Sequence, residues 1–331
     1  MSKSNSLLLA ALTLTACATV TPDAATPQRS GAQSMPNTPL TVSLATATPG
    51  GGFPVYGEAF AAAIKDADPA ITVEARNTKG SAENVPLLEQ GKVDLGLVQG
   101  EAAYEALAGI NRAGPANMKV LWAMYSSPGM FVVRTDSPYQ QIGDLKGKPV
   151  AWGAQGSGLV LLGGYVVDAL GMNRDRDFKA IYLEKAGDGP AMVQDGRAAA
   201  LWGGGIGWPG FTTMANSPAG ARFIAPSSAE IDTILKKHTF MRRVTIPAGA
   251  YKGIDRDLPS VGSWSFVFAR TDLPEETAYR LARALHKAQG ALGTKLAQAK
   301  ESTAANTAAA ADPRLLHPGV ARYLREIGGA S

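Results

Sequence analysis

The sequence predicts an α/β fold in which two lobes, joined by two crossing strands, enclose a central cleft. Two observations carry this prediction. A strand, a glycine-containing loop and a helix follow one another repeatedly, and this pattern restarts near the middle of the chain. Between the two series, residues 120–134 form a long apolar segment with Pro128-Gly129 inside it, as expected where a chain passes from one lobe to the other.

The first series has the order strand, helix, strand, helix, strand. Apolar or alternating residues mark the strands, and glycines mark the loops between elements. The predicted elements are a strand at 41–46, a helix at 58–65, a strand at 71–75, a helix at 85–90 and a strand at 95–98. This order indicates a parallel sheet covered by helices.

The second series repeats this order and is followed by a second crossing strand. Its predicted elements are a strand at 150–152, a helix at 159–170, a strand at 180–183, a helix at 190–194, a strand at 198–202, the crossing strand at 265–269 and an amphipathic helix at 274–292. We therefore expect lobe 1 to comprise residues 40–133 and 248–331, and lobe 2 to comprise residues 134–247.

The composition describes a globular protein and excludes several kinds of chemistry. Apolar residues make up 45% and charged residues 18% of the 331 residues. The formal net charge is +4, but Lys and Arg form no run, so we expect no nucleic-acid partner. One cysteine and three widely spaced histidines give neither a disulfide nor a metal-ligand pattern. Because no activated nucleophile and no dinucleotide or phosphate motif occurs, we expect no cofactor, no metal and no enzymatic activity.

The N-terminus indicates export. Residues 1–16 contain Lys3 and then an apolar run that is typical of a signal peptide and too short to span a bilayer. The run ends in Leu-Thr-Ala-Cys17, which resembles the lipobox of bacterial lipoproteins, so Cys17 is the expected lipidation site. The alternative is an ordinary signal peptide with Cys17 incidental. Residues 17–39, rich in Pro, Ser and Thr, are expected to form a flexible tether. Ala18 follows the cysteine, and by resemblance to Gram-negative lipoproteins we expect a periplasmic protein whose only membrane contact is its lipid, in the outer membrane rather than the inner one.

Three loops each end a strand, contain glycine and open a helix, at residues 50–53, 80–84 and 155–158. Glycine allows the backbone to approach a ligand closely, and the first N–H groups of a helix carry partial positive charge without a partner in the helix. In an open α/β sheet such loops converge beyond the carboxyl ends of the strands, so together they predict a cleft for an anion. Taken singly, each loop is equally well explained as a tight turn with a helix cap, and Ser81 and Ser157 suit either role.

A further glycine cluster lies between two tryptophans, Trp202 and Trp208. Flexible backbone beside indole rings suits a pocket wall that encloses a small ligand. Trp208 precedes a proline in a loop and is the better pocket candidate. For Trp202, a place in the core is an equal alternative.

Six short motifs occur in order along residues 41–328. They are Gly51-Gly52 before an aromatic residue, Gly80-Ser81-x-Glu83-Asn84, Asp94-Leu-Gly-Leu-Val-Gln99, Asp144-Leu-Lys-Gly-Lys148, Gly156-Ser157-Gly158 and Leu316-His317-Pro318-Gly319-Val-Ala-Arg-Tyr323. The ordered set resembles the TAXI family, the solute-binding proteins associated with TRAP transporters. The resemblance implies a type II periplasmic-binding-protein fold that closes on a small organic acid or acidic amino acid, with a TRAP membrane permease as partner.

The resemblance also carries the family's ligand contacts to Gly52, Ser81, Asn84, Gln99 and Ser157. The chain departs from the family at the first loop, where residues 51–56 read Gly-Gly-Phe-Pro-Val-Tyr in place of Gly-Gly-Thr-Tyr-Tyr-Pro, and at the second, where Lys79 stands in place of a glycine. The ligand's identity is therefore not carried over. Lys79 is a further candidate to pair with an anionic group.

These arguments give one set of candidate ligand contacts and one preferred function. The candidates are Gly51, Gly52, Phe53, Tyr56, Lys79, Ser81, Asn84, Gln99, Gln155, Gly156, Ser157, Gly158, Gly204, Gly205 and Trp208. The preferred function is an extracytoplasmic receptor that captures a small carboxylate or amino acid for TRAP-type transport. The alternative is a ligand-binding sensory lipoprotein that is not coupled to a permease.

Overall fold

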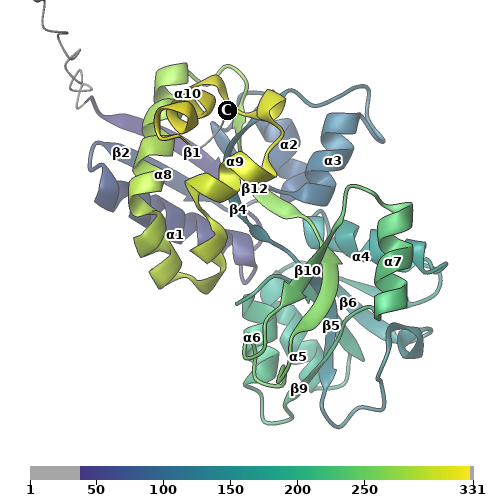
Figure 1. Ribbon diagram of the computed structural model, residues 1–331. Coiled ribbons are helices and arrows are strands. Elements are labelled where there is room, and N and C mark those ends of the chain that lie inside the picture. The colour runs from purple at the N-terminus through teal and green to yellow at the C-terminus, as the bar shows by residue number, and fades with distance from the viewer. Residues whose placement is uncertain (1–37, 329–331) are drawn as a thin grey trace, which may run out of the picture. The chain divides into compact units, whose positions relative to one another are not determined.

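The computed structural model describes residues 38–328. The predicted signal peptide, Cys17 and all but the last two residues of the predicted tether lie outside this range. Within it, two five-stranded mixed sheets are each packed against helices (Figure 1). The predicted α/β class is confirmed. No helix between residues 38 and 328 is both long and apolar enough to cross a membrane.

The first sheet has the strand order β2-β1-β3-β12-β4. Its strands are β1 (Leu40–Ala45), β2 (Ile71–Arg76), β3 (Leu95–Gln99), β4 (Met118–Ser126) and β12 (Trp264–Arg270). Strand β1 is parallel to β2 and β3, whereas β12 runs antiparallel between β3 and β4. The helices that accompany this sheet are α1 (Gly52–Ala67), α2 (Ser81–Glu89), α3 (Gly100–Ala108), α8 (Glu275–Lys295), α9 (Ala304–Ala310) and α10 (Pro318–Glu326).

Helix α1 shows why this part of the chain folds as it does. Tyr56, Phe60 and Ile64 recur every four residues and are all fully buried, so they form one apolar stripe on the helix. They belong to the same core as the strand residues Leu44 and Leu97. The helix ends at Ala67, and the N–H of Asp68 donates to the carbonyl of Ile64.

The second sheet has the strand order β7-β6-β8-β5-β9. Its strands are β5 (Gly129–Arg134), β6 (Pro149–Ala154), β7 (Lys179–Leu183), β8 (Ala200–Gly204) and β9 (Ala221–Ile224). Strand β6 is parallel to β7 and β8, and β5 is antiparallel to β8 and β9. Beside this sheet lie α4 (Gly158–Ala169), α5 (Gly189–Gln194), α6 (Pro209–Ala215), α7 (Ser228–Lys237) and the antiparallel pair β10 (Arg242–Ile246) and β11 (Leu258–Gly262).

The two sheets are connected at two places that lie next to each other. Strand β4 leads into β5 through Ser127-Pro128, and β11 leads into β12 through Ser263. The N–H of Ser127 donates to the carbonyl of Ser263 at 3.0 Å. Because β5, β10 and β11 pack with the second sheet, we propose lobe boundaries at Pro128 and Ser263 in place of the expected 133/134 and 247/248.

Candidate ligand-binding site

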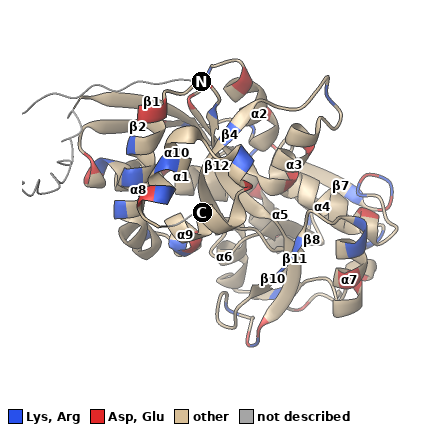
Figure 2. Ribbon diagram, turned by 45° about the horizontal axis from the view of Figure 1, so that its top comes forward, with Lys and Arg blue, Asp and Glu red and all other residues tan. Residues whose placement is uncertain are grey.

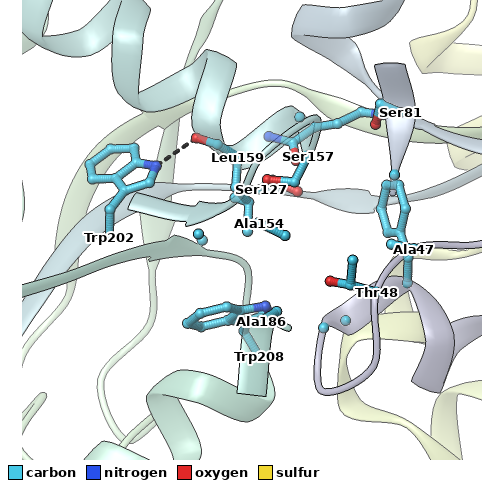
Figure 3. A pocket seen from close by; sticks show the side chains of 18 of the residues that line it. Ala47, Thr48, Ser81, Ser127, Ala154, Ser157, Leu159, Ala186, Trp202 and Trp208 are labelled. Carbon is cyan, nitrogen blue, oxygen red and sulfur yellow. Dashed lines mark hydrogen bonds between the residues drawn. The ribbon is translucent and has the colours of Figure 1, made fainter. Parts of the chain in front are cut away.

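A cavity of about 50 Å³ lies between the two lobes, at the carboxyl ends of strands from both sheets (Figure 3). Strands β3, β4, β6 and β8 all end at its wall. The lining residues are Ala47, Thr48, Gly51, Gly52, Phe53, Gly80, Ser81, Gln99, Tyr125, Ser127, Gly153, Ala154, Ser157, Gly158, Leu159, Ala186, Trp202, Gly204 and Trp208. The position matches the rule that ligands of open α/β sheets bind beyond the carboxyl ends of the strands.

Helix N-termini give the cavity its electrostatic character. Helices α1, α2 and α4 begin at Gly52, Ser81 and Gly158, and each of these residues lines the cavity. Helix α3 begins immediately after Gln99, which also lines it. The first N–H groups of a helix carry partial positive charge, so their convergence suits an anion. None of the lining residues in the described part of the chain carries a formal charge, so main-chain dipoles provide this potential.

Two serine hydroxyls are arranged to donate hydrogen bonds into the cavity. The Ser81 oxygen accepts from the N–H of Gln99 at 3.1 Å, and the Ser157 oxygen accepts from the N–H of Val160 at 3.4 Å as the N-cap of α4. A hydroxyl whose oxygen already accepts from the backbone keeps its own hydrogen for another acceptor. Both hydroxyls can therefore serve a carboxylate oxygen of a ligand.

Aromatic side chains form the apolar wall of the cavity. Trp202 and Trp208 both line it, and both are buried. The indole N–H of Trp202 donates to the carbonyl of Leu159 at 2.7 Å, shown by the dashed line in Figure 3. Trp202 also packs at a ring-centroid distance of 4.7 Å against Phe131 in the core of the second sheet. Trp202 therefore lines the cavity and also packs in the core, which are the two positions considered for it from the sequence.

Most of the sequence-predicted contacts come together at this cavity. The predicted residues that line it are Gly51, Gly52, Phe53, Ser81, Gln99, Ser157, Gly158, Gly204 and Trp208. They come from loops separated by up to about half of the described chain. We propose these residues as ligand contacts.

Two of the predicted contacts have their polar groups occupied by the protein itself. The Asn84 amide donates to the carbonyls of Thr46 and Leu97, both at 2.7 Å, and its oxygen accepts from Thr78 at 2.7 Å. The Tyr56 hydroxyl is fully buried and bonded to Ser302 at 2.8 Å. We therefore remove Asn84 and Tyr56 from the proposed contacts and assign them to the support of the site.

The remaining predicted residues lie around the cavity without lining it. The side chains of Lys79 and Gln155 are exposed. Gly156 is half-buried, and its carbonyl accepts from the N–H of Ala82 on the opposite lobe at 3.1 Å. The carbonyl of Gly205 accepts from the Tyr251 hydroxyl at 2.6 Å. Lys79 in particular contributes no charge to the lining.

The sequence reasoning missed several lining residues, among them Tyr125 and Ser127, which carry hydroxyl groups. Both stand at the carboxyl end of β4, where the chain begins its crossing between lobes. The predicted crossing segment could have indicated these two residues, because a strand that ends at a cleft brings its last side chains to that cleft. Ala47 and Ala186 are small and carried no signal.

Glycines allow the lobes to approach each other closely around the cavity. A Cβ on Gly50 would lie 2.6 Å from the Cα of Gly187. A Cβ on Gly158 would overlap the Cβ of Gln99, and one on Gly80 would lie 3.2 Å from the carbonyl oxygen of Gly156. We call these three contacts, Gly50–Gly187, Gly80–Gly156 and Gly158–Gln99, the closing seam. The structure therefore shows the lobes in a closed arrangement.

One buried carboxyl group lies directly behind the cavity wall. Glu101 is fully buried in the first turn of α3 and accepts from the side-chain amide of Gln99 at 2.9 Å. Burial raises the pKa of the Glu101 carboxyl to about 7, because the charged form loses its hydration. No group of three His, Cys, Asp or Glu residues within residues 38–328 is arranged to hold a metal ion.

Comparison with known proteins agrees with the geometry. A model of the NMT1-like family matches residues 44–328. Among solved structures, MatC from Rhodopseudomonas palustris with bound malate has a TM-score of 0.57 at 15% identity, covering 87% of this chain and 96% of that one. The structure of a periplasmic transporter has a TM-score of 0.54 at 13% identity, covering 80% of this chain and 88% of that one. A protein from Bordetella bronchiseptica RB50 has a TM-score of 0.51 at 13% identity, covering 87% of this chain and 98% of that one. These similarities show the fold, and the predicted periplasmic-binding-protein fold is confirmed.

Proposed function

Because the chain belongs to the NMT1-like family, we propose that it is an extracytoplasmic receptor that captures a small organic acid or acidic amino acid between its lobes and serves a transporter. The observation that carries this proposal is the cavity between the lobes, lined by the N-termini of α1, α2 and α4. Two of these helices belong to one lobe and the third to the other, so an anion held by all of them bridges the lobes. Such a ligand would stabilise the closed arrangement over an open one.

The ligand class follows from what the wall offers. Backbone N–H groups and the hydroxyls of Ser81, Ser157 and Tyr125 are donors suited to carboxylate oxygens. The indole of Trp208 covers apolar carbons. The structurally similar MatC is described with bound malate, a carboxylate, which is in keeping with this class.

We extend the proposal to the partner and the location. The ordered motifs that resemble the TAXI family support a TRAP permease as the transporter. The Leu-Thr-Ala-Cys17 pattern supports a lipid anchor on a periplasmic protein, with Ala18 favouring the outer membrane. Figure 2 shows acidic and basic residues interspersed over the described chain, so a partner would meet a surface of mixed charge.

The test uses calorimetry and a matched pair of variants. Small acids and amino acids are titrated into the full chain, and molecules released from the purified protein by mild denaturation are identified by mass spectrometry. Ser157→Ala removes an N-cap hydroxyl at the cavity and should weaken binding about tenfold. Ser227→Ala removes the N-cap hydroxyl of α7, far from the cavity, and should leave affinity unchanged. Absence of any bound or co-purified acid, or equal affinity of the two variants, would count against the proposal.

A further inference from the structure

A buried glutamine, Gln298, lies next to the cavity. Gln298 stands on the short 3₁₀ helix η3 (Ala297–Glu301), and only 3% of it is exposed. Neither its amide nitrogen nor its oxygen has a hydrogen-bond partner among residues 38–328. Buried carboxamides with both polar atoms unpaired are rare, because each atom loses its hydration without compensation.

The carboxamide is directed at the N-terminus of α1. Its nitrogen lies 3.4 Å from the position that a Cβ would take on Gly52, the first residue of that helix. The same position is 3.3 Å from the Tyr125 hydroxyl oxygen and 3.3 Å from Cδ1 of Trp208. Gly52, Tyr125 and Trp208 all line the cavity. On the opposite lobe, the nitrogen lies 3.3 Å from the corresponding position on Gly205. Gln298 therefore lies beside residues of both lobes that form or adjoin the cavity wall.

Buried hydrogen bonds hold this segment in place. The Glu301 carboxylate accepts from the backbone N–H and the hydroxyl of Ser126 at 2.7 and 2.9 Å. The Ser302 hydroxyl donates to the carbonyl of Ala123 at 3.0 Å. Both partners lie on β4, so η3 is fixed to the end of the edge strand that leads into the crossing between the lobes. This support places the Gln298 side chain at the wall while using none of its own polar atoms.

We propose that Gln298 determines specificity by donating to and accepting from a hydroxyl group that the ligand carries beside its carboxylate. The inference rests on the proposed function and narrows its ligand to a small hydroxy-monocarboxylate. A hydroxyl both donates and accepts, and so complements the two unpaired atoms of a carboxamide. The wall offers no charged side chain in the described part of the chain, which disfavours a second carboxylate and equally an ammonium group.

The experiment compares pairs of acids that differ by one hydroxyl. Glycolate and acetate, and lactate and propionate, are titrated into the full wild-type chain, Gln298→Met and Gln289→Met. Methionine keeps the length of the side chain and removes both polar atoms. Gln289 is the control, because its oxygen already accepts a structural hydrogen bond from the N–H of Ala304 at 3.0 Å.

We expect wild type to bind a hydroxy acid at least about tenfold more tightly than its deoxy partner. Gln298→Met should reduce this preference to less than about twofold, while its ligand-free melting temperature stays the same or rises. Gln289→Met should keep the preference and melt at a lower temperature.

Three outcomes would overturn the inference. If Gln298→Met keeps the preference for hydroxy acids, or if wild type prefers the deoxy acids, the Gln298 carboxamide does not recognise the ligand hydroxyl. The proposed function stands in either case. If wild type binds none of these acids and no acid co-purifies with it, the proposed function itself fails and the inference fails with it.

Discussion

At the scale of single residues, Glu101 is the side chain whose charge state matters most. Its carboxyl group is fully buried and accepts a hydrogen bond from the side chain of Gln99, which lines the cavity. Since burial raises its pKa to about 7, the folded protein binds a proton there between roughly pH 4.5 and 7, whereas the unfolded chain has released it. Stability from this group is therefore complete below pH 4.5 and is lost as the pH rises through 7.

Glu101→Gln should remove this pH dependence. The amide has the shape of the protonated acid and does not ionise, so the variant should match wild type near pH 4 and exceed its unfolding free energy by about 3 kcal/mol near pH 8.5. Urea unfolding of both proteins at several pH values measures the difference in their unfolding free energies. Groups that titrate in both proteins contribute equally and cancel in this difference. A constant difference across the range would show that Glu101 does not titrate as its burial requires.

At the scale of secondary-structure elements, helix α7 depends on its cap. It buries only Ile231 and Ile234, so packing contributes little. Ser227 forms a capping box, in which its backbone N–H donates to the Glu230 carboxylate at 2.7 Å and its oxygen accepts from the Glu230 N–H at 3.4 Å.

Ser227→Ala should lower the unfolding free energy by about 1 kcal/mol, since two N-terminal donors of α7 lose their arrangement. Denaturant unfolding at neutral pH checks the value, and Ser227→Asp, which keeps an acceptor, should recover most of it. An unchanged midpoint for the alanine variant would mean that water replaces the cap without cost.

The same elements show what the sequence could and could not predict. Strands β1, β3, β6 and β8 followed from their apolar runs and glycine loops, because these strands are largely buried and bounded by turns. The segment from β9 to β11 was not predicted, since strands such as β10 are largely exposed and lack a clear alternation. Strand β5 was assigned to the first lobe, and only its pairing with β8 and β9 reveals the second.

The candidate site was predictable to the extent that it is built from local motifs. Glycine loops and helix starts led to Gly52, Ser81 and Ser157, all of which line the cavity. The supporting role of Asn84 was not foreseen, because its partners are carbonyls of Thr46 and Leu97, whose proximity no spacing reveals. Gln298 was not found, because the bonds that place η3 join residues 175 positions apart.

At the scale of the whole described molecule, closure depends on the closing seam. Gly158 has an ordinary negative φ at the start of α4, so alanine is compatible with its backbone. Its methyl group would nevertheless overlap Gln99 of the opposite lobe in the closed arrangement. The substitution therefore penalises closure and not folding.

Gly158→Ala should weaken ligand binding at least about tenfold without lowering the melting temperature of the ligand-free protein. Small-angle scattering should show compaction on ligand addition for wild type and none for the variant. Gly290→Ala is the control, because a Cβ there meets nothing within 4 Å on α8. It should bind normally and gain about 0.5–1 kcal/mol of stability. A Gly158→Ala protein that compacts and binds like wild type would disprove this account of closure.

The closing seam consists almost entirely of main chain, whereas the part of the cavity wall outside the seam includes large side chains such as Trp208. A main-chain surface presents the same atoms whatever substitutions surround it. Ligand preference can therefore be altered at side chains outside the seam, such as Trp208 or Gln298, while the closing motion, and the shape that a partner recognises, stay the same. The protein is therefore suited to redesign for new ligands, because the closed shape that signals binding would stay the same.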